Sequence, residues 1–364
     1  MTTAMPSRHP APIRVLIADD SAVMRAALSR IVESSPAMMV CGTARDGLDV
    51  LEKIRQLQPD VVTLDVEMPV LNGFDALKRI MKECPLPVVM VSCLTQHGAE
   101  LTLEALAVGA FDYLSKANSG NQLEAQRIRH ELIEKIEAAA HSSLLIRPHS
   151  PPPLLPQSSP RAEVVEDSEV TPEIIALGTS TGGPKALQDI LPQLPADLPL
   201  PMIVVQHMPA GFTAPFVKRL NSLSKVKVRE ARHGEVPEPG VVYIAPAGKH
   251  TTVIRNADSV SLCLSNSPFD TQHKPSVDVT MLSVAEVFGR HCVGIILTGM
   301  GTDGLEGMTA IRNAGGVTIG QDEASCAVYG MPRCCAESGI LQKIVPISYV
   351  PWQILRVIRY RARD

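Results

Sequence analysis

The hydrophobic positions of the first 140 residues fall into short apolar runs that alternate with segments of helical periodicity. Residues 13–18 form a compact apolar run, which predicts a buried strand, and residues 22–35 follow with helical spacing. Five strands alternating with five helices predict a parallel sheet covered by helices on both faces. The four further strands are expected at 38–44, 61–65, 87–92 and 111–115, and the further helices at 46–59, 73–84, 99–110 and 121–140.

Residues 173–364 carry a second alternating pattern, typical of another α/β domain with a Rossmann-like parallel sheet. The expected strands are 174–178, 202–207, 292–299 and 315–321, and the expected helices are 184–194, 210–224, 277–290, 304–315 and 350–362. Four short runs separated by turn residues predict an embedded antiparallel insert, at 226–231, 241–247, 251–256 and 261–265.

The stretch between the two patterns, residues 139–172, predicts a linker. From Arg147 to Pro172 there are seven prolines in 26 residues, no aromatic residue and an acidic patch. Such a segment lacks the apolar surface needed to fold by itself, and its prolines make it a semi-stiff spacer. A proline-rich recognition motif is the alternative. The expected domains are therefore 12–138 and 173–364.

Composition and charge narrow the class of protein. A chain of 364 residues with 45% hydrophobic and 20% charged residues is long enough for two globular domains. The net charge of −4 provides no basic surface for nucleic acid, and no apolar run reaches the roughly 18 residues of a membrane span. The N-terminus lacks the apolar core of a signal peptide, and the eight cysteines include no C-x-x-C pair. We therefore expect a cytoplasmic protein with reduced thiols, no nucleic-acid partner and no direct membrane insertion.

Chemically active residues follow the expected strands of the first domain. Asp19 and Asp20 follow the first strand, Asp65 closes the third, Ser92 closes the fourth and Lys116 follows the fifth. Parallel α/β sheets form their sites at the carboxyl ends of the strands, so these side chains are expected to meet. Clustered carboxylates suit Mg²⁺, and the lysine and hydroxyl suit the oxygens of a phosphoryl group that one carboxylate accepts. Taken alone, Asp19 is better explained as a helix cap or turn residue.

Over residues 12–138 the sequence resembles a response-regulator receiver domain. The resemblance rests on the motifs DD at 19–20, LDVEMP at 64–69, NGFDAL at 72–77, VS at 91–92 and YLSK at 113–116. It implies that a histidine kinase phosphorylates Asp65. The other implied site residues are the switch pair Ser92 and Tyr113, the phosphate-binding Lys116, and the Mg²⁺ ligands Asp20, Asp65 and the backbone carbonyl of Glu67, assisted by Asp19.

The second domain opens on an apolar strand and a glycine-rich turn, IIALGTSTGGPK at 174–185. Ser180 lies at the tip of this turn, beside free backbone N–H groups and the positive end of the next helix, which favours a developing negative charge. The alternative is a phosphate-binding loop. The segment does not fit that alternative. A proline breaks the Walker spacing G-x-x-x-x-G-K-[ST], and the dinucleotide-binding pattern G-x-G-x-x-G is missing.

A nucleophilic serine requires a base and an acid from other strand ends of the same sheet. His207 follows the apolar strand MIVVQ, and Asp303 follows the strand CVGIILTG. Ser180 would then attack a carbonyl group, His207 would take its proton and Asp303 would orient the imidazole. The run G-T-S-T-G also fits the nucleophile elbow of α/β-hydrolases, but the order Ser, His, Asp differs from theirs, so we reject that fold.

Other residues near these strands are weaker candidates. The backbone N–H of Met300, in the segment TGMGTDG, is a candidate oxyanion-hole donor, and the alternative is a plain strand-to-helix turn. His233, His250 and His291 lie in or beside strands and are expected to be structural. His273, in HKPSVD, is a candidate for the substrate side of the site.

Over the whole second domain the sequence resembles the chemotaxis protein-glutamate methylesterases of the CheB family. The resemblance rests on LGTSTGGP, VVQHMP, HKPSVDV, LTGMGTDG and VYGMP, together with the preceding receiver. It implies Ser180, His207 and Asp303 as the catalytic triad, with no cofactor in this domain. The implied reaction is hydrolysis of glutamate methyl esters, and deamidation of glutamines, on methyl-accepting chemoreceptors. Thr179 and Thr302 replace the expected alanine and asparagine, so we expect altered substrate handling with an intact mechanism.

Two functional hypotheses follow. In the first, the chain is a phosphorylation-activated serine hydrolase, in which the unphosphorylated receiver covers the Ser180 site until a chemotaxis histidine kinase phosphorylates Asp65. In the second, the receiver is coupled to a non-catalytic ligand-binding or transcriptional output domain. A DNA-binding output requires clustered Arg and Lys, and the basic cluster RVIRYRARD at the C-terminus is better explained as a solvated helix face. We therefore favour the hydrolase.

Overall fold

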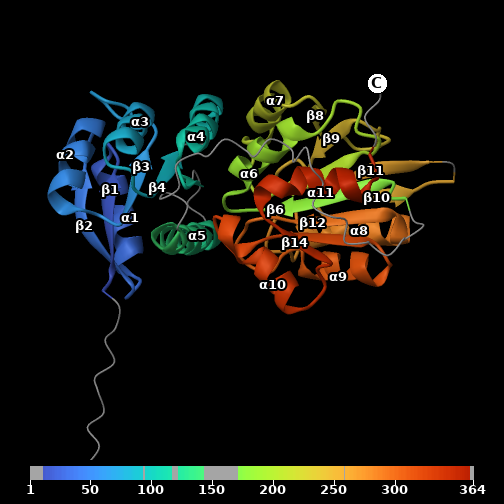
Figure 1. Ribbon diagram of the computed structural model, residues 1–364. Coiled ribbons are helices and arrows are strands. Elements are labelled where there is room, and N and C mark those ends of the chain that lie inside the picture. The colour runs from blue at the N-terminus through green and yellow to red at the C-terminus, as the bar shows by residue number, and fades with distance from the viewer. Residues whose placement is uncertain (1–10, 93–94, 117–121, 143–170, 258, 361–364) are drawn as a thin grey trace, which may run out of the picture. The chain divides into compact units, whose positions relative to one another are not determined.

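The structure is a computed structural model that describes residues 11–92, 95–116, 122–142, 171–257 and 259–360 (Figure 1). The chain forms two compact units, an N-terminal one and a C-terminal one. Most of the expected linker, residues 139–172, lies outside the described residues, and the domain boundaries 12–138 and 173–364 stay predictions. Among the helices of the described residues, none has both the length and the apolar composition needed to cross a bilayer.

The N-terminal unit contains a five-stranded parallel sheet with the strand order β2-β1-β3-β4-β5. This confirms the expected alternation of strands and helices. The strands are β1 (Ile13–Ala18), β2 (Met38–Ala44), β3 (Val61–Asp65), β4 (Val88–Ser92) and β5 (Asp112–Ser115). The helices that alternate with these strands along the chain are α1 (Ala22–Glu33), α2 (Gly47–Leu57), α3 (Gly73–Glu83), α4 (Gln96–Val108) and α5 (Gln122–His141).

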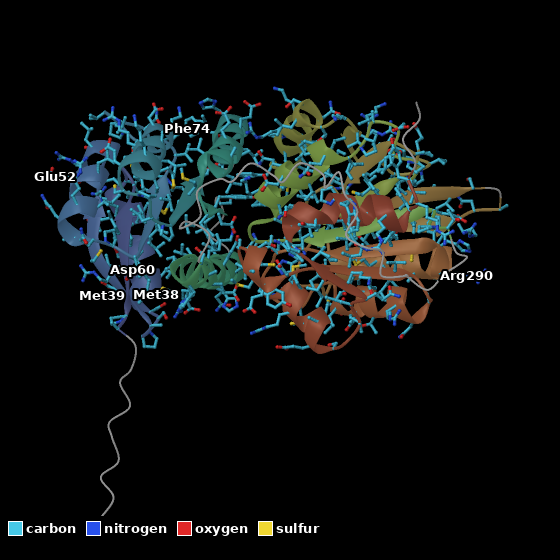
Figure 2. The ribbon with its side chains drawn as sticks, viewed as in Figure 1. Met38, Met39, Glu52, Asp60, Phe74 and Arg290 are labelled. Atoms are coloured by element: carbon cyan, nitrogen blue, oxygen red, sulfur yellow. The ribbon has the colours of Figure 1, made fainter. Side chains whose placement is uncertain are left out.

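The local sequence explains these elements. All residues of β3 and β4 are buried, as expected of apolar strands with helices on both faces of the sheet. In the edge strand β2 neighbouring side chains point to opposite faces, so Met38 is buried while Met39 is 39% exposed (Figure 2). The first three helices begin after side chains that accept hydrogen bonds from first-turn N–H groups, namely Ser21, Asp46 and Asn72.

Gly73 fixes where α3 starts relative to the end of β3. A Cβ atom at this position would lie 1.8 Å from the backbone carbonyl oxygen of Asp65, so only glycine fits. The Gly73 N–H donates to the carbonyl of Val66 (3.0 Å). These contacts hold the carboxyl end of β3, and with it Asp65, against the start of the helix.

The C-terminal unit contains a seven-stranded sheet, in which each pair of neighbours is parallel, with the order β14-β13-β12-β6-β7-β9-β8. Its strands are β6 (Ile174–Thr179), β7 (Met202–Gln206), β8 (Lys227–Glu230), β9 (Val241–Ile244), β12 (Cys292–Ile296), β13 (Val317–Gln321) and β14 (Lys343–Val345). A separate antiparallel hairpin consists of β10 (His250–Arg255) and β11 (Val260–Ser265). The helices are α6 (Gly183–Ile190), α7 (Thr213–Leu223), α8 (Val277–Phe288), α9 (Leu305–Asn313), α10 (Met331–Glu337) and α11 (Val350–Val357).

The prediction of an antiparallel insert is only partly correct. Strands β8 and β9 belong to the parallel sheet, and the antiparallel part is the pair β10 and β11. The physical reason is that β9 is buried along its whole length, which suits a strand with both faces covered. The sequence pattern also missed α10 and β14, because the first is a seven-residue helix with a proline near its start and the second spans three residues.

Strand β12 ends at Ile296, before the expected end at Gly299. Two glycines that follow, Gly301 and Gly304, have positive φ angles of 83° and 102°. Glycine adopts such angles readily, but they do not occur in a regular strand. Residues 297–304 therefore form a loop at the carboxyl end of the sheet, and this loop carries Asp303.

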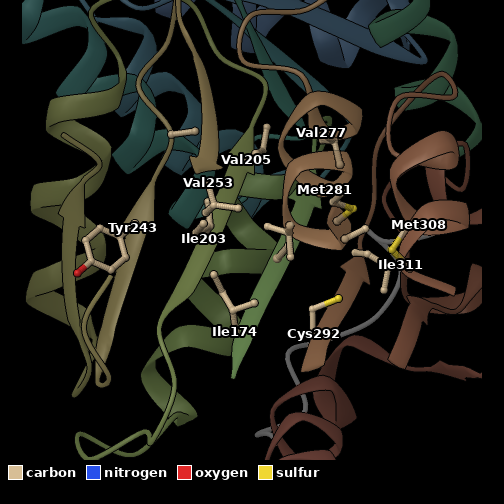
Figure 3. Packing of buried hydrophobic residues seen from close by; sticks show 14 of the residues in the cluster. Ile174, Ile203, Val205, Tyr243, Val253, Val277, Met281, Cys292, Met308 and Ile311 are labelled. Carbon is tan, nitrogen blue, oxygen red and sulfur yellow. The ribbon is translucent and has the colours of Figure 1, made fainter. Parts of the chain in front are cut away.

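The core of the C-terminal unit brings α8 and α9 together with the sheet. Buried side chains of Met281 from α8 and Met308 from α9 gather with Ile174, Ile203 and Cys292 of the strands (Figure 3). Burying one such large apolar side chain contributes about 1.5–3 kcal/mol. This packing fixes the two helices whose first turns lie beside the loop of Asp303.

Gly178, in β6, allows the first turn of α8 to approach the strand. A Cβ atom there would lie 2.3 Å from Cγ1 of Val277. We expect Gly178→Ala to destabilise the C-terminal unit by about 1–3 kcal/mol, because extra volume in a packed core forces the backbone to shift. Urea unfolding followed by the fluorescence of Trp352, the single tryptophan of the chain, measures this loss.

Val277→Ala in the Gly178→Ala background is the matched control, because it removes the methyl groups that the new Cβ atom would meet. The cost of the Gly178 substitution should be smaller in that background than in the wild type. Equal urea midpoints for the wild type and Gly178→Ala would contradict the close approach.

Candidate active site and acidic cluster

Three neighbouring strands of the large sheet carry the expected catalytic residues. Ser180 follows β6, His207 follows β7, and Asp303 lies in the loop after β12. Because the order β12-β6-β7 makes these strands adjacent, the three side chains come from one edge of the sheet. The structure therefore brings together the three residues that the sequence singled out.

Backbone hydrogen bonds fix the turn that carries Ser180. Its N–H donates to the carbonyl of Thr298 (3.0 Å), and its carbonyl accepts from the Gly183 N–H (2.8 Å). Thr179, which is fully buried, donates its hydroxyl to the same Thr298 carbonyl (2.8 Å). The left-handed conformation of Gly182, with φ of 76°, turns the chain into α6. The position of the serine is thus set by its own turn and by the loop after β12.

A buried amide, Gln206, ties the serine turn to the histidine. Its Nε2 group donates to the backbone carbonyls of Ser180 (2.9 Å) and His207 (2.8 Å). The His207 N–H donates in turn to the carbonyl of Thr179 (3.2 Å). Sequence reasoning missed Gln206. Its place at the end of an apolar strand was the available signal, because a buried amide requires hydrogen-bond partners.

The three side chains form a continuous hydrogen-bonded relay. His207 Nδ1 lies 3.1 Å from Ser180 Oγ, and His207 Nε2 lies 2.7 Å from Asp303 Oδ2. An ionised carboxylate only accepts hydrogen bonds, so the neutral imidazole carries its proton on Nε2 and presents Nδ1 as the acceptor toward the serine. This ring orientation is the reverse of that in chymotrypsin-like serine proteases, where Nε2 faces the serine.

Asp303 is held at the N-terminus of α8. Its carboxylate accepts hydrogen bonds from the Ser276 hydroxyl (2.9 Å), the Val277 N–H (2.8 Å) and the Asp278 N–H (2.9 Å). Burial alone would raise the pKa of Asp303, but His207 and the two amides outweigh it and hold the pKa well below its usual range. The helix dipole acts in the same direction. Asp303 is therefore negatively charged at neutral pH.

Gly299 brings the loop after β12 into contact with Ser180. A Cβ atom on Gly299 would lie 2.9 Å from the Cβ atom of Ser180. The Gly299 carbonyl accepts the N–H groups of Gly330 (3.0 Å) and Met331 (2.9 Å), which anchors the loop to the start of α10. Met300 follows directly, and its role as an oxyanion-hole donor stays a prediction.

His273 lies on the imidazole of the relay. The rings of His273 and His207 stack, with centroids 3.9 Å apart and planes inclined by 18°. His273 therefore covers one face of the His207 ring. The sequence suggested a place near the substrate for His273, but it gave no indication of a stack on the relay histidine.

The other three candidate histidines have structural partners, as expected. His250 is fully buried, and its Nδ1 atom accepts the N–H of Ser276 (3.2 Å). His233 accepts a backbone N–H, and His291 lies within hydrogen-bond distance of a backbone carbonyl. His250 thereby helps to hold Ser276, whose hydroxyl binds the carboxylate of the relay.

The N-terminal unit gathers its expected acidic residues around one lysine. Lys116 Nζ lies 2.8 Å from Asp19 Oδ2 and 2.7 Å from Asp65 Oδ2. Asp20 completes the acidic cluster, since oxygens of Asp19, Asp20 and Asp65 all lie within 4.8 Å of one another. Asp19 and Asp65 are buried, whereas Asp20 is exposed. A group of carboxylate oxygens of this kind is typical of Mg²⁺ sites.

Opposite charges hold this cluster together. Burial raises the pKa of Asp65, and Lys116 opposes that effect. Burial alone would lower the pKa of Lys116, but Asp19 and Asp65 outweigh it, so that the pKa of the lysine is raised. Asp19 also fulfils the turn role considered from the sequence, because its Oδ1 atom accepts the Ser21 N–H (2.9 Å).

The remaining expected receiver residues are Ser92, Tyr113 and Glu67. Ser92 closes β4 and Tyr113 lies in β5, and both are buried. The Ser92 carbonyl accepts the backbone N–H of Lys116 (2.8 Å), which ties the ends of β4 and β5 together. The Glu67 N–H lies 3.5 Å from Asp65 Oδ1, so Glu67 adjoins the cluster. The functional roles of these residues stay predictions.

Removing the lysine tests the electrostatic arrangement of the cluster. We expect Lys116→Ala to destabilise the N-terminal unit by about 3–5 kcal/mol at neutral pH, because two buried carboxylates lose their cation. The loss should shrink as the pH falls toward about 4, where carboxyl groups that lack a cation take up protons. Urea unfolding followed by circular dichroism measures this loss of stability, while the fluorescence of Trp352 reports the unfolding of the C-terminal unit separately.

Lys78→Ala is the matched control, since Lys78 pairs with Asp75 at 3.1 Å while their side chains are 49% and 47% exposed. An exposed pair of this kind contributes little, so the control should unfold close to the wild type. A loss in Lys116→Ala no larger than that in Lys78→Ala would contradict the proposed charge balance.

Comparison with known proteins gives the family. Residues 15–127 match the family described as response regulator receiver domain, and residues 175–354 match the family described as CheB methylesterase. Two relatives named protein-glutamate methylesterase/protein-glutamine glutaminase are each 42% identical. The relative from Pyrococcus abyssi aligns over 346 residues (95% of this chain, 94% of the relative), and that from Bacillus subtilis over 353 residues (95% and 99%).

A solved structure gives the same result for the C-terminal unit. The crystal structure of the Thermotoga maritima CheB methylesterase catalytic domain is similar to this chain with a TM-score of 0.50 and 38% sequence identity. The similarity covers 52% of this chain and 100% of that one. The chain therefore belongs to the CheB methylesterase family, with a response regulator receiver domain preceding the methylesterase domain.

Proposed function

We propose that the chain is a phosphorylation-activated protein-glutamate methylesterase and protein-glutamine glutaminase that acts on chemoreceptors in chemotaxis adaptation. The observation that carries this proposal is the relay from Ser180 Oγ through His207 to Asp303, with separations of 3.1 Å and 2.7 Å. The names of the relatives support the substrate class. In this proposal Ser180 is the nucleophile, His207 is the general base and Asp303 orients the imidazole and stabilises its protonated form.

In the first half of the reaction, Ser180 Oγ attacks the carbonyl carbon of a glutamate methyl ester. His207 Nδ1 takes the hydroxyl proton, and the Asp303 carboxylate stabilises the imidazolium through the Nε2–H group. The backbone N–H of Met300 would stabilise the oxyanion, a contribution commonly worth about 10²–10³ in rate. The tetrahedral intermediate then expels the alkoxide, which receives the proton from His207, so methanol leaves and an acyl-enzyme forms.

Water completes the reaction. His207 Nδ1 takes a proton from the water that attacks the acyl carbon, and it returns that proton to Ser180 Oγ as the glutamate side chain leaves. A glutamine side chain follows the same path, with ammonia in place of methanol. Both halves use only water and residues of this chain.

The receiver would control this activity. We propose that a chemotaxis histidine kinase is the phosphodonor and that Asp65 accepts the phosphoryl group. The acidic cluster fits Mg²⁺, which when bound would neutralise the charge of the phosphoryl oxygens. The residues assigned to this step are the phosphate-binding Lys116, the switch pair Ser92 and Tyr113, and the Mg²⁺-binding group of Asp19, Asp20, Asp65 and the backbone carbonyl of Glu67.

A cytoplasmic location is part of this proposal. It is supported by the cysteines of the described residues, which are free thiols and therefore suit a reducing compartment.

Replacing the nucleophile tests the catalytic assignment. Ser180→Ala should lower methanol release from methylated chemoreceptor membranes by at least about 10³-fold, because the relay loses the attacking hydroxyl. A fluorophosphonate probe should label the wild type but not this variant. Ser222→Ala is the matched control, since Ser222 is an exposed serine of α7 whose hydroxyl donates to a backbone carbonyl.

Labelling of Ser180→Ala at the wild-type rate would remove the nucleophile assignment. A wild type that releases no methanol and is not labelled would favour the non-catalytic output domain.

Phosphorylation tests whether the receiver controls the esterase activity. A small-molecule phosphodonor with Mg²⁺ should raise methanol release by the full chain, and Asp65→Asn should abolish that response because it removes the acceptor carboxylate. The exposed Asp75 of α3 provides the control Asp75→Asn, which should keep the response.

Deleting residues 1–146 should raise the basal rate of methanol release, because the deletion removes the inhibiting receiver. A deletion variant no faster than the unphosphorylated full chain would contradict inhibition by the receiver.

A further inference from the structure

The ring of His273 closes one face of the His207 imidazole. The ring centroids lie 3.9 Å apart, which is closer than the separation of about 4.5–7 Å that is usual for aromatic pairs. Since carbon atoms in contact are about 3.5–4.0 Å apart, the rings overlap directly and leave no room for a water molecule between them. The side chain of His207 is accordingly only 7% exposed.

The hydrogen bonds of the relay do not by themselves prevent the His207 ring from tilting. The lone pair of Nδ1 and the N–H bond of Nε2 both point outward in the plane of the ring, toward Ser180 and Asp303. These bonds oppose a displacement within that plane. Rotation of the ring about its Cβ–Cγ bond meets little resistance, because the χ2 torsion of histidine has a broad energy well. A contact on the ring face is what limits this rotation.

The loop that carries His273 is anchored on both sides of it. Residues 266–276 connect β11 to α8. On one side, the carbonyl of Lys274 accepts the N–H of Gly248 (3.0 Å). On the other side, the hydroxyl of Thr271 lies 3.1 Å from Nε2 of His250. The position of His273 is therefore fixed by the chain on either side of it.

His250 also joins this loop to the carboxylate of the relay. Its Nδ1 atom accepts the N–H of Ser276 (3.2 Å), so the ring is neutral and carries its proton on Nε2. Nε2 lies 3.1 Å from the carbonyl oxygen of Pro268. The hydroxyl of Ser276 donates in turn to Asp303 (2.9 Å). One network of hydrogen bonds thus positions both the stacking loop and the carboxylate.

We propose that His273 is a positioning residue of the relay, whose flat ring holds the His207 imidazole in line with the serine and the carboxylate and keeps water from its face. This inference rests on the proposed function of the relay. A ring that cannot tilt keeps its geometry through both proton transfers. Where water is excluded, the charge of the protonated imidazole interacts more strongly with the carboxylate of Asp303.

Labelling of the full chain by a small fluorophosphonate probe tests the proposal, because this reaction needs the relay but no receptor. His273→Ala should lower the maximal labelling rate by at least about tenfold, since a tilted ring misplaces the base. The probe concentration that gives half of the maximal rate should change by less than about threefold, because the probe does not need His273 for binding. His273→Phe restores a flat ring without ring nitrogens, and its maximal rate should stay within about threefold of the wild type.

Two further variants separate the flat ring from its polar atoms and from the loop. His273→Asn keeps a polar side chain but has no ring, so it should be labelled as slowly as His273→Ala. Gln272→Ala changes an exposed neighbour in the same loop, and it should be labelled at the wild-type rate. Urea unfolding followed by the fluorescence of Trp352 verifies that each variant is folded under the labelling conditions.

Proton NMR supplies a readout that a loss of stability alone would not change. The Nε2–H proton that His207 donates to Asp303 should give a downfield resonance in the wild type, in His273→Phe and in Ser180→Ala. In His273→Ala this resonance should broaden or disappear, because water reaches the open ring face and the hydrogen bond bends.

Labelling of His273→Ala at the wild-type rate would overturn the proposal. Slow labelling of His273→Phe would also overturn it, because a flat ring would then not be sufficient, and this result counts even if His273→Ala does not fold. Normal labelling of His273→Ala with slow methanol release from chemoreceptor membranes would place His273 on the receptor instead of the relay. These results would leave the proposed function intact, since the wild type is labelled. A wild type that the probe does not label would remove the proposed function and this inference together.

Discussion

The ionised carboxylate of Asp303 at the start of α8 is the interaction on which the rest of the catalytic unit depends. A buried charge costs several kcal/mol unless donors surround it. Here a hydroxyl and two N–H groups of residues 276–278 and a nitrogen of His207 supply those donors. Because the donors belong to the start of α8 and the end of β7, one charge fixes the loop after β12 relative to both. Ser180 carries no charge and is positioned instead by backbone hydrogen bonds.

In the N-terminal unit the charge of the buried carboxylates is compensated in another way. Both units place buried carboxylates at the carboxyl ends of parallel strands, where the chain turns away from the sheet. In the C-terminal unit neutral donors and a histidine compensate the charge, and the carboxylate stays fixed. In the N-terminal unit one lysine is shared by Asp19 and Asp65, so the same cation contacts the carboxylate assigned to accept a phosphoryl group and its neighbour. The first arrangement suits a permanent relay and the second suits a site whose charge changes.

The sequence was sufficient for the parts of the fold and site that follow from strand ends. Ser180, His207 and Asp303 could be grouped because each comes just after an apolar run, and parallel strands bring their carboxyl ends to one edge. The same reasoning grouped Asp19, Asp20, Asp65 and Lys116. It failed for β8 and β9, since the sequence of a four-residue strand does not show whether the neighbouring strand is parallel.

Other features of the site depend on geometry that no local pattern contains. The stack of His273 on His207 requires that the loop before α8 lie beside the end of β7. The role of Gln206 depends on which backbone carbonyls its neighbours leave without partners, and the role of Ser276 depends on where the Asp303 carboxylate lies. The ring orientation of His207 follows from the positions of the serine and the carboxylate on either side, and those positions come only from the assembled sheet.

The adjacency of β12, β6 and β7 has a consequence for how this protein family can vary. Neighbouring strands lie about 4.8 Å apart, so the hydrogen-bond repeat of the sheet sets the span from hydroxyl to carboxylate. The number of residues between the reacting side chains in the sequence does not affect this span. Between β7 and β12 the chain forms two more strands of the sheet, a hairpin and the two α-helices α7 and α8. Lengthening the hairpin turn would therefore reshape the outer surface while the reacting atoms keep their spacing, and new surface features could evolve there without a cost to the chemistry.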